Sequence, residues 1–122
     1  MPTIISVTPA GGERRYTALY EKKDVGGFQA SQVLDPRQYQ AEFDRQAAAG
    51  RKLVYLNTYD DGGARFTAIW YSNAAPAYVR HALSAPAFHT ELNAQRAKGL
   101  LTRALTGYED GRNVYYAAFW TR

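Results

Sequence analysis

The sequence predicts an α+β domain built from tandem repeats of about 49 residues, in the order ββ-α-ββ-α-ββ. The segment Leu53–Tyr71 reads as a β-hairpin, and its turn motif Tyr59–Gly62 recurs as Tyr108–Gly111, 49 positions later. The run from position 3 to position 20 has the same form, with Arg15–Ala18 standing opposite Arg65–Ala68 at an offset of 50. Self-similarity at a fixed period is the sequence signature of a repeat architecture.

Length and composition restrict the class of protein. The chain has 122 residues, no cysteine and a net charge of +4, which fits one domain over residues 1–122 that needs no disulfide. Lys and Arg are scattered and nearly always interleaved with acidic residues, without a basic tract, so we expect no nucleic-acid partner. The N-terminus lacks the basic and long apolar regions of a signal peptide, and no segment predicts a membrane span.

The first hairpin is predicted over residues 3–21. β-Branched residues alternate from Thr3 to Thr8, and a glycine-rich turn follows from Pro9 to Glu13. Residues 22–27 contain adjacent glycines and read as a loop. Phe28–Val33 is either extended or irregular, and the pattern does not choose between these.

A helix is predicted to begin after Asp35 and to end at Gly50, so that residues 22–50 form a connector and a helix. Asp35 suits the N-cap, Pro36 the first helical position, and Gln38 completes a capping box. Tyr39 and the apolar residues spaced four apart after it share one face.

The second hairpin covers residues 52–72, and the helix signals then repeat. Residues 73–99 form a second connector and helix, with Ser84 as its N-cap, Phe88 on its apolar face and Gly99 at its end. The third hairpin covers residues 100–121. Six antiparallel strands can form one open sheet with both helices on one face, or that sheet can curl into a barrel with the helices outside. A third arrangement pairs the open end with another copy.

The sequence does not predict an enzyme. It contains neither a Ser-x-x-Lys nor a Gly-x-Ser-x-Gly motif. His81 and His89 have no zinc-site spacing, so we expect structural and solvated roles for them, without a metal or other cofactor. The acidic pairs Asp60–Asp61 and Glu109–Asp110 fit turn chemistry better than a calcium loop.

Aromatic residues lie at or near the end of the second strand of each predicted hairpin, and they form the candidate binding surface. Because neighbours along a strand point to opposite faces, we expect one of each adjacent aromatic pair to be buried and the other exposed. These residues either pack in a core or stack on sugars or extended peptides. The candidate binding residues are Tyr20, Trp70, Trp120, Tyr59, Tyr108, Asp61, Asp110, Arg80 and His81.

The order of these motifs resembles the bacterial tandem repeat domain found beside the hydrolase domain of secreted polyglycine hydrolases. In the second repeat the resemblance is carried by Arg80, His81, Leu83, Ser84, Phe88, Glu91, Gly99, Tyr108 and Gly111. In the first repeat it is carried by Leu34, Tyr39, Glu42, Phe43, Gly50, Tyr59 and Gly62, while Ser31 and Gln32 stand where Arg and His are expected. The resemblance implies a secreted, non-catalytic accessory region.

Two functional hypotheses follow. The first is a non-catalytic repeat module that recognises an extracellular carbohydrate or peptide surface through its hairpin ends. The second is a structural repeat protein whose open ends pair into a homo-oligomer.

Overall fold

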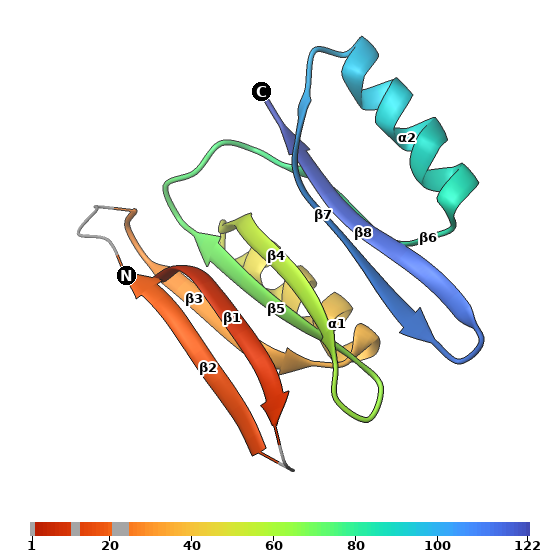
Figure 1. The fold of residues 1–122 in the computed structure, drawn as a ribbon. Coiled ribbons are helices and arrows are strands. Elements are labelled where there is room, and N and C mark those ends of the chain that lie inside the picture. The colour runs from red at the N-terminus through yellow and green to blue at the C-terminus, as the bar shows by residue number, and fades with distance from the viewer. Residues whose placement is uncertain (1, 11–12, 21–24) are drawn as a thin grey trace.

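The structure is a computed structural model that describes residues 2–10, 13–20 and 25–122, and in the first two ranges the side chains of Ile5 and Val7 only. The described residues form eight strands and two helices, which confirms the α+β class (Figure 1). The elements are β1 (Pro2–Ala10), β2 (Glu13–Tyr20), β3 (Phe28–Leu34), α1 (Pro36–Ala48), β4 (Lys52–Asp60), β5 (Ala64–Tyr71), β6 (Tyr78–Leu83), α2 (Ala85–Ala97), β7 (Leu101–Asp110) and β8 (Asn113–Thr121). The turn of the first hairpin at positions 11–12 and the loop at 21–24 lie outside the described residues.

The described strands form three separate antiparallel sheets. The N-terminal hairpin is β1-β2, and the other sheets have the orders β3-β5-β4 and β6-β8-β7. We call β3, α1, β4 and β5 the first unit, and β6, α2, β7 and β8 the second unit. The prediction of six strands in one sheet is therefore wrong, because the strands of each unit form a separate three-stranded sheet. The alternative of a closed barrel is also wrong, because these sheets are open.

The additional strands β3 and β6 lie where the sequence pattern is irregular. In β3 the pairing register with β5 shifts between Ser31 and Leu34. The register of β6 with β8 shifts at the equivalent place, between Arg80 and Leu83. Such a bulge breaks the two-residue alternation on which strand prediction depends.

Both helices have the predicted caps. The Asp35 carboxylate accepts a hydrogen bond from the Gln38 backbone N–H at 2.8 Å, and the Gln38 side chain accepts one from the Asp35 N–H at 2.9 Å. The Ser84 hydroxyl oxygen accepts a hydrogen bond from the Ala87 N–H at 3.2 Å. Gly50, just past the end of α1, has a φ of 79°, which glycine adopts at little cost.

Each helix packs on the sheet of its own unit rather than on one shared sheet. The Tyr39 ring of α1 contacts the Phe66 ring of β5, with 4.5 Å between ring centroids. The Phe88 ring of α2 lies 6.0 Å from that of Tyr116 and 6.2 Å from that of Trp120, both on β8. The unit is thus a two-layer βαββ element.

The sheets stack on one another with their edge strands β1, β4 and β7 side by side (Figure 1). The N-terminal hairpin packs on the first unit through a cluster that includes Ile5, Val7 and Ile69. The second unit packs on the opposite side of the first unit, through a cluster that includes Phe66 and Phe119. The first unit is therefore covered on both sides.

Hydrogen bonds join the neighbouring edge strands. The Tyr55 hydroxyl of β4 donates to the Ile5 carbonyl of β1 at 3.0 Å. The Thr58 hydroxyl of β4 donates to the Gly107 carbonyl of β7 at 2.9 Å. Together with the apolar clusters, these bonds fix how far each unit is displaced from the one before it.

Candidate functional site

A cleft lies between the hairpin ends of the two units. It has a volume of about 320 Å³ and is lined by Tyr59, Asp60 and Ala64 of the first unit and by Gly107, Tyr108, Glu109 and Val114 of the second. Each unit contributes the same part of the repeated motif, because Tyr59 and Tyr108, and likewise Asp60 and Glu109, hold equivalent places in it. The stacking of the units therefore creates the cleft.

The two tyrosines in the walls of this cleft are anchored to the bulges of the outer strands. The Tyr59 hydroxyl donates a hydrogen bond to the Gln32 carbonyl of β3 at 2.7 Å. The Tyr108 hydroxyl accepts a hydrogen bond from the Ala82 N–H of β6 at 3.0 Å. Ala82 has a φ of 57°, in the left-handed region that an L residue seldom occupies. The tyrosines thus hold the bulges in place, and the bulges orient the rings.

Burial raises the pKa of the Tyr108 hydroxyl, an effect that the nearby Asp110 and Tyr115 increase and the hydrogen bond from Ala82 partly offsets. Burial, and to a lesser degree Tyr108, also raises the pKa of Tyr39. Both phenols are therefore neutral near pH 7. Neither phenol supplies a phenolate. Of the two, only Tyr108 lines the cleft, because Tyr39 is 1% exposed and lies in the core.

The carboxylates at the cleft differ in their roles. Asp60 is exposed and accepts a hydrogen bond from the Gly63 N–H at 2.9 Å, as expected for turn chemistry. Glu109 is also exposed. Asp110 lines a neighbouring hollow of about 360 Å³ together with Asp35, Pro36, Arg37, Gly63, Ala64 and Arg65. Ala64 lines both hollows, so charged residues of both signs, including Arg65 and Asp110, lie beside the cleft.

Trp70 and Trp120 do not form an exposed aromatic platform. Their exposed fractions are 1% and 0%, and their neighbours Tyr71 and Phe119 are buried as well. The expectation that one member of each pair is exposed is wrong, because a helix covers one face of each three-stranded sheet and another part of the chain packs on the opposite face. Tyr20 ends β2, and its side chain lies outside the described part of the chain.

Arg80 and His81 do not line the cleft. The Arg80 guanidinium forms an ion pair with Glu91 of α2 at 3.0 Å. The His81 ring stands edge-on to Tyr39, with ring centroids 5.2 Å apart, and 6.2 Å from Phe66. His81 belongs to the second unit and these aromatics to the first, so it is part of the contact between the units. Burial, with a smaller contribution from the Arg80 charge, lowers the pKa of His81.

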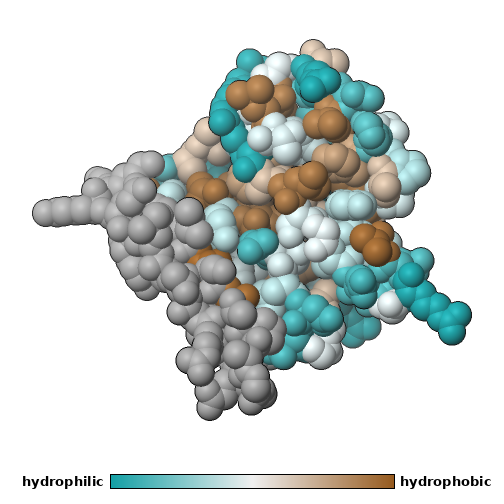
Figure 2. Space-filling model, viewed as in Figure 1, coloured by the Kyte–Doolittle hydropathy of each residue, from teal (hydrophilic) through white to brown (hydrophobic). Residues whose placement is uncertain are grey.

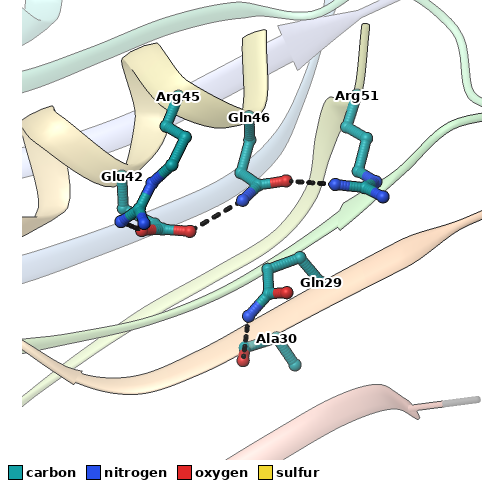
Figure 3. A network of polar contacts seen from close by, with 6 residues as sticks. All are labelled: Gln29, Ala30, Glu42, Arg45, Gln46 and Arg51. Carbon is teal, nitrogen blue, oxygen red and sulfur yellow. Dashed lines mark hydrogen bonds and ion pairs between the residues drawn. The ribbon is translucent and has the colours of Figure 1, made fainter. Parts of the chain in front are cut away.

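A Glu–Gln pair on each helix was not singled out from the sequence. Glu42 accepts a hydrogen bond from Gln46 at 2.7 Å, and Glu91 accepts one from Gln95 at 2.7 Å. The i,i+4 spacing in both helices was the available signal. In the first unit Glu42 pairs with Arg45, and Arg51 donates to Gln46 at 2.9 Å, as Figure 3 shows. Arg45 and Arg51 therefore place positive charge beside the Glu42–Gln46 pair, as Arg80 does beside Glu91 in the second unit.

Two further properties concern only the described residues. Neither helix there is long and apolar enough to cross a membrane. No three histidine or carboxylate side chains in that part of the chain come close enough to hold a metal ion.

We predict that Tyr108→Phe destabilises the chain more than Tyr59→Phe. Loss of the Tyr108 hydroxyl leaves the Ala82 N–H without its acceptor, which costs about 1–2 kcal/mol in the free energy of unfolding. Loss of the Tyr59 hydroxyl leaves the Gln32 carbonyl with a long contact to the Thr67 hydroxyl at 3.5 Å. Urea unfolding of both variants measures the difference, and equal losses would contradict the anchoring role given to Tyr108.

His81 makes stability depend on pH. Because its pKa is lower in the folded chain than the ordinary value of 6.5, the unfolded chain binds more protons between these two pKa values. The free energy of unfolding should therefore fall as the pH is lowered through about 6.5. His81→Gln introduces the residue that stands at the equivalent position 32 of the first unit. This variant should not show the decrease in the free energy of unfolding that protonation of His81 causes. The exposed His89 provides the control His89→Gln, which should keep the loss, and denaturant unfolding between neutral and mildly acidic pH distinguishes the two variants.

A comparison with known protein families matches the chain in three segments, two of which contain the two units. The family model described as polyglycine hydrolase-like, structural repeat matches residues 1–23, 25–73 and 74–122. The second and third matches correspond to the first and second units. No curated protein and no protein of solved structure matches the chain.

Proposed function

Because the chain belongs to the family of polyglycine hydrolase-like structural repeats, we propose that it acts as a non-catalytic recognition module of an extracellular protein. Its ligand is a polar chain molecule, an oligosaccharide in the first place and an extended peptide as the alternative. The ligand binds in the cleft between the hairpin ends of the two units.

The observation that carries this proposal is the construction of the cleft. Equivalent residues of both units meet there, with a tyrosine and an exposed carboxylate from each side. Tyrosine rings give contact area to sugar rings or peptide groups, and carboxylates accept hydrogen bonds from hydroxyl or amide groups. A concave site with aromatic walls and a few polar groups is the usual form of a ligand site.

Rigidity of the walls supports the same function. The hydroxyls of Tyr59 and Tyr108 are held by the outer strands at 2.7 and 3.0 Å. A ligand therefore meets rings that are already ordered, and less conformational entropy is lost on binding. The exposed carboxylates of Asp60 and Glu109 remain available to orient it.

The test is binding of the purified chain to glycan and peptide arrays, followed by titration calorimetry with the best ligand. We predict that the double variant Asp60→Asn, Glu109→Gln weakens binding about tenfold or more, corresponding to about 1.4 kcal/mol. The control is Asp44→Asn, because Asp44 is exposed on α1 and does not line the cleft. It should leave the affinity unchanged.

The array outcome also separates the ligand classes. A glycan hit sensitive to the double variant supports the first choice, and a peptide hit with the same sensitivity supports the alternative. Binding that both the double variant and Asp44→Asn weaken equally would contradict the assignment to the cleft. The absence of any hit from the folded chain would count against a recognition function.

A further inference from the structure

The second unit exposes a surface whose equivalent in the first unit is buried. Leu56 of β4 pairs with Ala68 of β5, and Leu105 of β7 pairs with Ala118 of β8 in the same register. The exposed fraction is 4% for Leu56 but 50% for Leu105. The two leucines have the same place in the sheet and differ only in what covers them.

A second position shows the same difference. Ala64 pairs with Asp60, and Val114 pairs with Glu109 at the equivalent place. Ala64 is 6% exposed, whereas Val114 is 53% exposed. Figure 2 shows hydrophobic residues on the surface of the part that contains the second unit. Because Val114 also lines the cleft between the units, Leu105 is the residue that marks the apolar area where the stack of described sheets ends.

The covering of Leu56 identifies what fits this area. Leu56 lies in one cluster with Ala117 and Phe119 of the second unit, against which Ala104 also packs. What covers a unit is thus the β-hairpin of another element of the same form. The first unit is itself placed against the N-terminal hairpin in this way, through Ile69 and Ile5.

The N-terminal hairpin has the same register as the hairpins of the units. It pairs Ile5 with Ala18, as Leu56 pairs with Ala68 and Leu105 with Ala118. It lies at one end of the described stack, and Leu105 lies at the other. A second copy of the chain can therefore continue the stacking that the chain already uses twice.

We propose that the β7–β8 face around Leu105 binds the N-terminal hairpin of a second copy of this chain. The contact is heterologous, because two different surfaces meet, so it generates a ring or an open series of copies rather than a symmetric pair. Burial of the leucine and its surroundings supplies the driving force, as it does at Leu56 within the chain.

The test measures the mass of the purified chain by sedimentation equilibrium over a wide range of concentrations. The wild type should associate, and Leu105→Arg should weaken association at least about tenfold. Leu101→Arg is the matched control, because Leu101 is an exposed leucine of the same strand. The register shift between Thr102 and Ala104 turns it to the other face of the sheet. Thermal unfolding of both variants checks that they fold.

A capture experiment tests the head-to-tail geometry. Immobilised wild type should bind soluble Leu105→Arg, which keeps its N-terminal hairpin, whereas immobilised Leu105→Arg should not bind it. Failure of wild type to capture the variant would point to a symmetric contact and overturn the geometry. A wild type that stays monomeric at all concentrations, or an equal effect of Leu101→Arg, would overturn the proposal itself.

Discussion

Face-to-face stacking of short sheets is the constraint on which the rest of this structure depends. A three-stranded sheet with one helix can bury only part of its apolar surface, so each unit requires cover from the next one. The first unit receives that cover from both sides, which is why adjacent residues such as Trp70 and Tyr71 are both buried. The stacking also brings the hairpin ends together and so creates the cleft that Tyr59 and Tyr108 of the repeated motif line.

Bulges in the outer strands connect this packing to the candidate site. At each bulge the strand leaves its regular pairing, and a backbone group becomes available to a tyrosine hydroxyl, Tyr59 in the first unit and Tyr108 in the second. The tyrosine of the Tyr-acid-Asp-Gly motif therefore has a structural reason to recur. It ties the hairpin end to the outer strand, and its ring becomes part of the cleft wall as a consequence.

The sequence was informative wherever a local rule decides the structure. The capping box at Asp35 and the cap at Ser84 depend on neighbouring residues alone, and the structure contains both. The strand β6 was missed because its bulge between Arg80 and Leu83 breaks the alternation. The burial of both Phe119 and Trp120 could not be read from alternation either, because Phe119 packs against the first unit and Trp120 against Phe88 of α2. For the site, the motif identified Tyr59 and Tyr108, whereas the cleft between them follows only from the stacking.

The most direct test of the stacking compares Leu56→Ala with Leu105→Ala in the free energy of unfolding of the monomer. The residue type and sheet register are the same in both cases. If the second unit covers the first, Leu56→Ala should cost about 2–4 kcal/mol, as a buried leucine does, and Leu105→Ala less than about 1 kcal/mol. Equal losses would contradict the account, because they would mean that the two leucines have the same surroundings.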